Sequence, residues 1–449
     1  MMKFAMGLAA AIMMAACSAD PADAPSPNNG AGENAASQIT AFVGANIIPM
    51  DGSDMVEVGT VIVEGDRITA VFSSGEIDPP EGAEIIDAAG QFLIPGLAEM
   101  HAHIPSGNSG WATEDILFLY VSQGVTTARG MQGGSGQLKL RARANAGDII
   151  SPTLYLAAPS MSGNSVRSPA QGVERVRKAK DDGWDLLKVH EGLSRETYDA
   201  IADTANELEI PFGGHVSDEV GLQHAANKGQ RTVDHLDNYL DFMGAETSPV
   251  IDEALSRAVA LTKGAGMGVV PTMALWEYFA AKPGDFDDYN ELRFVPKNVV
   301  DGWARRVASG GNTEASEDEQ AIYFENRRKL LKALADGGAE ILLGSDAPQL
   351  YSVPGFSIHR EMAAMAEAGM TPAQILHSGT AAPRAYFAEK DTFGQIAPGN
   401  RADLILVGAN PLDDISNASN INGVMVRGRW LSRDDIDARQ DELAAKYGN

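Results

Sequence analysis

Apolar runs of five to eight residues alternate with helix-like segments along the middle of the chain. The runs occupy residues 97–104, 125–130, 153–160, 186–191, 210–216, 232–236, 268–273 and 341–346. Segments with helical periodicity lie between them, including residues 113–123, 170–182, 195–209, 219–228 and 325–337. Nearly continuous apolar strands separated by helices are typical of parallel strands that are covered on both faces. Eight such units predict an α/β fold, the (β/α)8 or TIM barrel, over residues 96–393.

Shorter strand patterns occupy both ends of the chain. Turns rich in Gly, Asp and Pro separate apolar stretches at residues 39–48, 58–72 and 83–94, and a similar texture returns at 394–407 and 424–430. Strands at both ends with a barrel between them predict one small β-sandwich domain, formed by residues 38–95 and 394–432. Residues 433–449 have the pattern of a solvated helix.

One connection in the predicted barrel is unusually long. Residues 280–320 separate the seventh strand from its helix, and this stretch is acidic and contains Pro and Gly. Connections of this length without structure of their own are uncommon in compact domains. Two interpretations are open: a lid over the active site, or an insertion with no role there.

The first 37 residues are predicted to lie outside the fold. A single Lys precedes an apolar stretch, residues 4–16, which is too short to span a bilayer and has the pattern of a signal peptide. Residues 14–17 resemble a bacterial lipobox that ends at Cys17, which predicts a lipoprotein signal peptide over 1–17 and a flexible tether over 18–37. The protein is then exported and lipid-anchored, at the outer membrane if the host has two membranes, and therefore periplasmic or at the cell surface. Ordinary secretion with an incidental Cys17 is the alternative.

The composition and net charge of the chain limit the classes of partner that it can bind. The 449 residues are 44% hydrophobic, enough for a large core, and their number suggests two or three domains. A formal net charge of −26 disfavours nucleic acid and anionic membrane surfaces, because both carry phosphates. We therefore expect no nucleic-acid partner, and membrane contact only through the lipid anchor; a homo-oligomer is left open. Cys17 is the single cysteine, so no disulfide forms within the chain.

Polar residues with metal-binding chemistry end several of the predicted barrel strands. His101 and His103 are two positions apart, so in a strand they point to the same face. The other candidates close strands four, five, six and eight: Lys188, His215, His235 and Asp346. Each alone has an ordinary explanation, such as a capping carboxylate or a hydrogen-bonded core histidine. Together they predict a metal site, because the carboxyl ends of barrel strands carry the active site and a metal needs converging ligands.

This set of residues resembles the amidohydrolase superfamily in its two-metal form with a carboxylated lysine. Three further phrases carry the resemblance over nearly all of the chain beyond the tether: Phe92-Leu-Ile-Pro-Gly-Leu, Gly124-Val-Thr-Thr-Ala-Arg and Ala397-Pro-Gly-Asn-Arg-Ala-Asp-Leu-Ile-Leu. Within the superfamily the chain looks similar to the imidazolonepropionase-like group, which includes dipeptidases for Xaa-Pro and Xaa-Arg/Lys substrates. Two features depart from many relatives and bear on the substrate: Val-Ser-Asp after His215, and His190 at the end of strand four.

The resemblance implies a role for each ligand. One divalent ion would be held by the strand-one histidines and Asp346, the other by the histidines of strands five and six. Lys188 would bridge both ions as a carbamate formed by addition of CO₂ to its amine. Zn²⁺ suits these nitrogen and oxygen donors, and Mn²⁺, Fe²⁺ or Co²⁺ could replace it. A hydroxide that bridges the ions would attack the scissile carbonyl, polarised by one metal, with Asp346 as the general base.

Other residues near the predicted site are assigned by position. His190 shares the facing of Lys188, and Tyr239 lies just past strand six, so both are candidate substrate-binding residues. A supporting or packing role is equally open for His190, and a structural role is favoured for Tyr239. Arg129 ends strand two and is expected to pair with a carboxylate of the protein rather than of the substrate. The remaining histidines are expected to have supporting or structural roles: His224, His359 and His377.

The sequence thus predicts a metal-dependent hydrolase that cleaves a C–N bond, in a dipeptide or an N-acyl amino acid. An enzymatic alternative keeps the site and changes the bond to that of a cyclic amide, a lactone or a phosphotriester. A non-enzymatic alternative is a surface lipoprotein that binds metal or solute; the carboxylate predicted beside the histidines argues against it. The acidic body disfavours multiply acidic substrates and mildly favours neutral or cationic molecules. Together with the resemblance, this points to a small-molecule substrate with an uncharged or basic C-terminal residue.

Overall fold

The computed structural model describes residues 38–73, 78–105, 110–309 and 316–448. The predicted signal peptide, the tether and Cys17 lie outside these residues. Among the described helices, none is both long and apolar enough to cross a membrane.

Each apolar run predicted to be a barrel strand contains or overlaps a strand. The first three strands form one parallel sheet: β6 (Leu97–Ala102), β7 (Val125–Gly130) and β8 (Thr153–Leu156). The next five form a second parallel sheet: β9 (Leu187–Val189), β10 (Phe212–Gly214), β11 (Thr232–Asp234), β12 (Gly268–Val270) and β13 (Glu340–Ile341). Neighbouring strands in each sheet follow one another along the chain, as the βα repeat predicts.

Backbone contacts join the two sheets at both edges. Leu186, just before β9, forms a parallel bridge with Ala157, just after β8. At the other edge the backbone N–H of Met100 in β6 donates to the carbonyl of Leu343, and the N–H of Asp346 donates to the carbonyl of His101. The described strands therefore make a TIM-barrel-like α/β domain.

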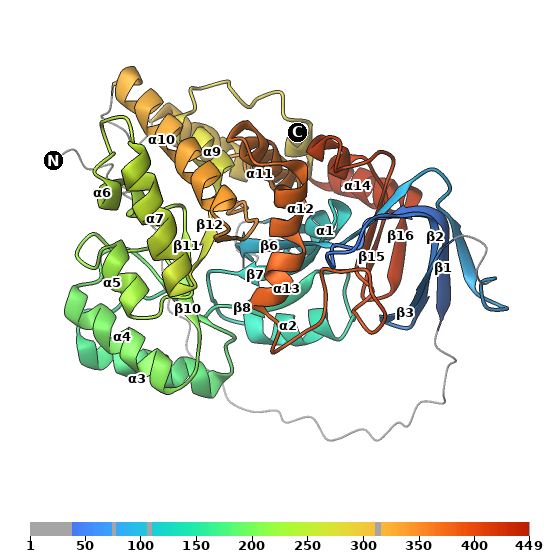
Figure 1. The fold of residues 1–449 in the computed structure, drawn as a ribbon, viewed down its shortest axis with the longest axis horizontal. Helices are drawn as coiled ribbons and strands as arrows, with labels where there is room; N and C mark the ends of the chain where they lie inside the picture. The colour runs from blue at the N-terminus through green and yellow to red at the C-terminus, as the bar shows by residue number, and fades with distance from the viewer. Residues whose placement is uncertain (1–37, 74–77, 106–109, 310–315, 449) are drawn as a thin grey trace.

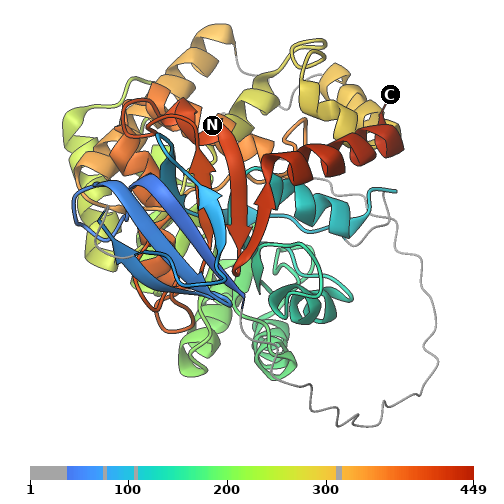
Figure 2. The same ribbon diagram turned by 90° about the vertical axis from the view of Figure 1, so that its right-hand side faces the viewer.

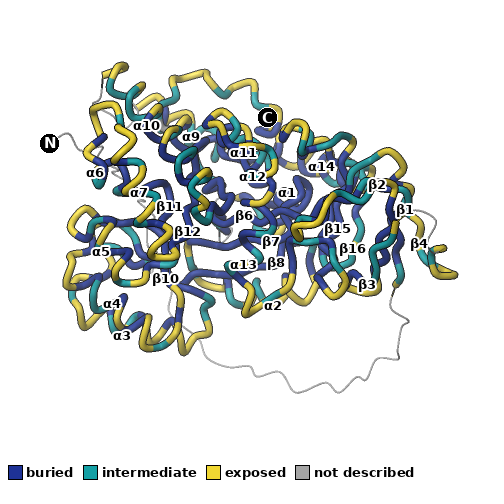
Figure 3. The backbone as a smooth tube through the Cα atoms, viewed as in Figure 1, coloured by how far each residue is buried: buried dark blue, intermediate teal, exposed yellow. Residues whose placement is uncertain are grey.

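Helices cover the outside of these strands (Figure 1). Their exposed faces form the outer surface, and the strands lie buried inside (Figure 3). From β6 to β12 they are α1 (Thr113–Ser122), α2 (Gln137–Asn145), α3 (Pro169–Asp182), α4 (Arg195–Glu207), α5 (Leu222–Asn227), α6 (Tyr239–Met243) and α7 (Asp252–Ala265). After β12 come α8 (Met273–Ala280), α9 (Lys297–Ala308), α10 (Glu317–Asp336), α11 (Phe356–Glu367), α12 (Pro372–Gly379) and α13 (Ala381–Tyr386).

Helix ends follow local sequence. The side chain of Ser168 accepts a hydrogen bond from the backbone N–H of Gln171 at the start of α3, with Pro169 in the first turn. The same helix ends at Gly183, which takes a left-handed conformation with φ of 83°. These signals explain why the pattern located this helix to within a residue.

The long connection after β12 is partly helical and packs through aromatic rings. It contains the 3₁₀ helix η1 (Asn290–Phe294) and α9. The Trp303 ring of α9 lies 6.5 Å from the Trp111 ring and 5.7 Å from the Tyr351 ring, measured between centroids. These partners belong to the loops that follow the first and the eighth barrel strands, so the connection is anchored beside those loops. Its role as a lid stays a prediction.

Strands from both ends of the chain form one mixed sheet beside the barrel (Figure 2). Its order is β16-β15-β14-β5-β1-β2-β3, with β4 paired to β1. The first chain segment supplies β1 (Ile39–Ile47), β2 (Val56–Glu64), β3 (Arg67–Phe72), β4 (Glu84–Asp87) and β5 (Phe92–Pro95). The second supplies β14 (Leu404–Val407), the 3₁₀ helix η2 (Ile415–Ser419), β15 (Ile421–Val426) and β16 (Arg429–Ser432). The described strands show one sheet, and its division into the two layers of a sandwich is not seen.

The C-terminal helix α14 (Arg433–Tyr447) is amphipathic rather than fully solvated. Ser432 and Asp435 form a capping box at its start. Leu443 and Tyr447 are buried, and the Tyr447 hydroxyl donates to Asp115 of α1 at 2.8 Å. The helix therefore ties the end of the chain to the first helix of the barrel.

Candidate metal centre

The six residues predicted to bind metal lie at the carboxyl ends of the barrel strands. His101 is in β6, and Lys188 is the middle residue of β9. The other four directly follow or come shortly after a strand: His103, His215, His235 and Asp346. Five of the six are buried, and the exception is His103, whose side chain is 28% exposed.

Asp346 lies among the histidines. Its Oδ1 atom is 2.7 Å from Nε2 of His103 and 3.5 Å from Nε2 of His101. Its Oδ2 atom is 3.7 Å from Nε2 of His235. Donor atoms of His101, His103 and Asp346 all lie within 4.8 Å of one another, a spacing that can hold one metal ion.

The remaining ligands adjoin this group. Nζ of Lys188 lies 3.4 Å from Nε2 of His101. The His235 ring lies 4.6 Å from the His101 ring and 4.6 Å from the His215 ring, between centroids. The structure thus brings together all six residues that the sequence singled out.

Three of the histidines are held from behind through Nδ1. Asp234 Oδ2 lies 2.9 Å from Nδ1 of His101, and Nδ1 of His235 lies 2.8 Å from the hydroxyl of Thr272. Nδ1 of His215 lies 2.7 Å from a carboxylate oxygen of Asp237. Partners at Nδ1 fix the ring orientation and leave Nε2 for a metal. Sequence reasoning missed all three partners.

Burial sets the protonation of the centre. It lowers the pKa of His101 to about 4 and holds the pKa of His215 and His235 well below the ordinary histidine value, so all three imidazoles are neutral at pH 7. Burial also lowers the pKa of Lys188, which favours the free amine that could add CO₂. Neutral imidazoles, a carboxylate and an amine without thiolate are a donor set that fits Zn²⁺ and similar divalent ions.

His190 lies at the edge of the centre. Its ring is 4.0 Å from the His215 ring, between centroids, and it is partly exposed. The backbone N–H of Glu191 donates to Nδ1 of His190 at 2.8 Å. A neutral His190 therefore carries its proton on Nε2, as a hydrogen-bond donor.

Tyr239 packs inside the protein, the role that the sequence favoured over a substrate contact. It is fully buried, and its hydroxyl lies 2.6 Å from the hydroxyl of Thr262 in α7. This contact belongs to the packing of α6 on α7 and gives no support to a substrate contact.

Arg129 pairs with a protein carboxylate, as predicted: its Nη2 atom is 3.2 Å from Oδ1 of the buried Asp234. The remaining histidines lie in helices. Nε2 of His359 in α11 is 3.0 Å from the carbonyl of Gln123, and Nε2 of His224 in α5 is 2.6 Å from Asp199. His377 lies in α12.

A second acidic group adjoins His215. Glu191, His215 and Asp237 also place donor atoms within 4.8 Å of one another. The Glu191 carboxylate is 4.0 Å from Nδ1 of His215 and its side chain is 34% exposed. Burial and the charge of Asp218 raise the pKa of Glu191 to about 7. No pattern in the sequence pointed to Glu191, which was read only as the end of a strand.

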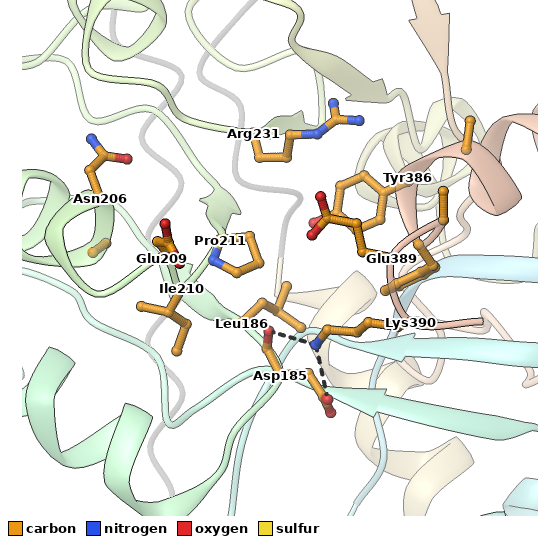
Figure 4. Close-up of a pocket in the computed structure, with 14 residues that line it drawn as sticks. Asp185, Leu186, Asn206, Glu209, Ile210, Pro211, Arg231, Tyr386, Glu389 and Lys390 are labelled. Carbon is orange, nitrogen blue, oxygen red and sulfur yellow. Dashed lines mark hydrogen bonds and ion pairs between the residues drawn. The ribbon is translucent and has the colours of Figure 1, made fainter.

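A cavity of about 640 Å³ lies at the other ends of the strands. Its lining includes Leu186, Pro211 and Arg231, each just before β9, β10 or β11, together with Tyr386 and Lys390 (Figure 4). Because the metal ligands lie at the carboxyl ends of these strands, this cavity is separate from the centre.

Comparison with known proteins adds the family. Residues 92–431 match the profile of the amidohydrolase family, which covers most of the chain and includes all six ligands. The chain belongs to the amidohydrolase family. As an amidohydrolase it is a hydrolytic enzyme, and the resemblance to this superfamily and to its imidazolonepropionase-like group is confirmed.

This amidohydrolase has distant relatives among characterised proteins. It is 22% identical over 444 residues to the ochratoxinase of Aspergillus niger, covering 84% of this chain and 83% of that protein. It is 24% identical over 404 residues to the imidazolonepropionase of Geobacillus kaustophilus, covering 83% and 90%. Its fold is similar to that of a Xaa-Pro dipeptidase with methionine bound in the active site, with a TM-score of 0.68, 18% identity, and 88% of this chain and 100% of that chain covered.

Proposed function

We propose that this amidohydrolase uses two divalent ions to hydrolyse a C–N bond in a small molecule, a dipeptide or an N-acyl amino acid. The observation that supports this most is the position of Asp346, which lies within 3.7 Å of three histidine nitrogens at the carboxyl ends of the strands. A protein that merely binds metal could use this carboxylate only as a ligand, whereas a hydrolase also needs a base at this point. The names of the relatives support the class of bond.

Under this proposal the ligands divide between two ions. His101, His103 and Asp346 would hold one ion, His215 and His235 would hold the other, and Lys188, as a carbamate, would serve both. Zn²⁺ is the ion we propose, with Mn²⁺, Fe²⁺ or Co²⁺ as alternatives. When bound, the pair of ions would supply an activated water and polarise the scissile carbonyl.

Two side chains, Asp346 and His190, have the remaining catalytic roles in this proposal. Asp346 accepts the proton of the attacking water and delivers it to the leaving amine. His190 offers its Nε2–H to the oxygen on which negative charge develops as the carbonyl is attacked. The buried side chains around Asp346 and His190 lower the local dielectric, which strengthens the interactions of both groups with the substrate.

The direct test is a substrate screen with metal analysis. Purified protein loaded with Zn²⁺ or Mn²⁺ would be assayed against libraries of dipeptides and N-acyl amino acids, with lactones and phosphotriesters in parallel. We expect close to two ions per chain, amide hydrolysis, and loss of activity in chelator that returns on adding metal. One ion or none in active enzyme would overturn the two-metal proposal. Activity confined to lactones or phosphotriesters would overturn the assignment of the bond.

Replacing His190 with Phe should lower kcat by about 100-fold or more with a smaller change in KM, because a donor to a developing oxyanion is worth about that much. His190→Gln keeps an N–H donor on a flexible side chain and should retain more of the activity than the Phe variant. Steady-state kinetics on both variants measures the difference. Wild-type kcat in the Phe variant would exclude this role for His190.

The half-exposed Glu191 should favour substrates with a cationic group. Glu191→Gln is expected to reduce the preference for Lys-terminated over Met-terminated dipeptides by roughly 2- to 5-fold, the range of a partly solvated ion pair. The measurement is the ratio of kcat/KM values, with Glu389→Gln, in the cavity at the opposite strand ends, as the matched control. A clear preference of the wild type for Asp- or Glu-terminated dipeptides would contradict the argument from charge.

A further inference from the structure

The carboxylate of Asp234 lies behind two of the metal ligands at once. Asp234 is the last residue of β11, and its side chain has no exposed surface. Its Oδ2 atom is 2.9 Å from Nδ1 of His101 and 3.5 Å from Nζ of Lys188. A single oxygen therefore reaches ligands on β6 and on β9, which belong to different sheets.

Arg129 holds the other oxygen of this carboxylate. Its Nη2 atom is 3.2 Å from Oδ1 of Asp234. Its Nε donates to the carbonyl of Met100 at 2.6 Å, and its Nη1 donates to the hydroxyl of Thr232 at 3.1 Å and to that of Tyr386 at 3.4 Å. The guanidinium is as completely buried as its partner, so both are held in one geometry by contacts on β6, β11 and α13.

Burying the Arg129–Asp234 ion pair has a large desolvation cost. Removing two charges from water often costs more than their attraction returns, and two apolar side chains of similar volume would pack at least as well. This cost is explained if the Asp234 carboxylate is needed for the contacts of Oδ2 with His101 and Lys188. Outer partners of this kind orient a metal-binding histidine and fix which ring nitrogen carries the proton.

We propose that Asp234, held by Arg129, is a positioning residue that fixes the orientation of both His101 and Lys188. Oδ2 faces Nδ1 of His101 at 2.9 Å, which leaves Nε2 for the metal, and the same oxygen lies 3.5 Å from Nζ of Lys188. This inference rests on the proposed metal-dependent function. Because His101 belongs to one ion and Lys188 is shared by both, the loss of Asp234 should weaken both ions.

The other two outer partners behave differently in this proposal. Asp237 contacts His215, and Thr272 contacts His235, so each supports one histidine of the second ion. Replacing Asp237 should therefore weaken one ion, and replacing Asp234 should weaken two. This contrast separates a shared positioning role from a general loss of order in the site.

The test compares Asp234→Asn and Asp237→Asn with a matched control, Asp403→Asn. Asp403 is equally buried, and Oδ2 lies 2.6 Å from Nη2 of Arg401, but it contacts none of the six ligands. Metal content would be measured by elemental analysis after dialysis against graded chelator, and Co²⁺-substituted protein would report ligand geometry by its visible absorption. We expect affinity for both ions to fall 10- to 100-fold in Asp234→Asn, for one ion in Asp237→Asn, and for neither in Asp403→Asn.

Three results would overturn the proposal: wild-type affinity and Co²⁺ spectrum in Asp234→Asn, the loss of only one ion in that variant, or equal loss of metal in Asp403→Asn. If Asp234→Asn does not fold because Arg129 is left unpaired, the double variant Arg129→Met/Asp234→Asn removes both charges. That variant should fold and bind both ions weakly, and tight binding would again overturn the proposal. A wild-type protein that binds no metal would instead refute the proposed function.

Discussion

Asp346→Asn is expected to lower kcat/KM by at least about 1,000-fold, the largest effect of any single substitution in this chain. The change removes a general base, which typically contributes 10²- to 10⁴-fold, and weakens a metal ligand in the same step. The carboxylate is suited to both roles: burial favours its neutral form, but the neighbouring His101 and His103 hold the pKa of Asp346 well below the ordinary value. Its charge is therefore kept at pH 7.

The measurement is kcat/KM on the best substrate from the screen, together with metal content. Asp185→Asn is the control, because Asp185 is also a partly buried, ion-paired carboxylate but contacts Arg141 and Lys390 at the opposite ends of the strands. It should keep nearly full activity. An Asp346→Asn protein with more than a tenth of wild-type kcat/KM would show that another group is the base.

The second large effect is expected for Lys188→Ala. This variant should lose most of its metal and more than about 100-fold in activity, exceeding the loss of an outer partner of a metal site. Lys188 is buried 3.4 Å from Nε2 of His101 and 3.5 Å from Asp234, so its removal leaves a hole that only a small anion could fill. Short carboxylic acids such as acetate should restore part of the activity with metal present.

Lys390→Ala, which removes an exposed lysine paired with Asp185, should behave like the wild type and serves as the control. Full activity in Lys188→Ala would mean that no carbamate bridges the ions. Loss of activity without loss of metal would point instead to a contact between Lys188 and the substrate.

The six predicted ligands could be singled out from the sequence because a local pattern carries them. Parallel barrel strands are buried on both faces, so they appear as apolar runs, and a polar residue that closes such a run stands out. The fold then brings every run end to the same side of the barrel. His215 and Asp346 were located in this way although more than 100 residues separate them.

The outer partners could not be found in this way. Asp234 contacts His101 across the barrel, and nothing near Asp234 in the sequence marks that contact. Asp237 and Thr272 likewise contact histidines on the neighbouring strand, and these contacts exist only once the strands have paired.

Backbone conformation explains why Tyr239, one of the two candidate substrate contacts, does not face the site. His235, Leu236 and Asn238 all have positive φ, at 63°, 56° and 59°. Residues other than Gly rarely adopt this conformation, and three of them within four positions turn the chain sharply after β11. Tyr239 therefore starts α6 with its ring buried against α7, a direction that residue counting from the strand end could not show.

The mixed sheet has a consequence for synthesis. β5 pairs with β14 through Pro95 and Leu404, which are about 300 residues apart along the chain. At a translation rate of about 5–20 residues per second, β5 waits roughly 15 to 60 s for this partner, with one edge of an apolar strand unpaired. The six predicted ligands all precede β14 along the chain, so they are synthesised before this sheet can close. Pairing with β14 then covers the open edge of β5.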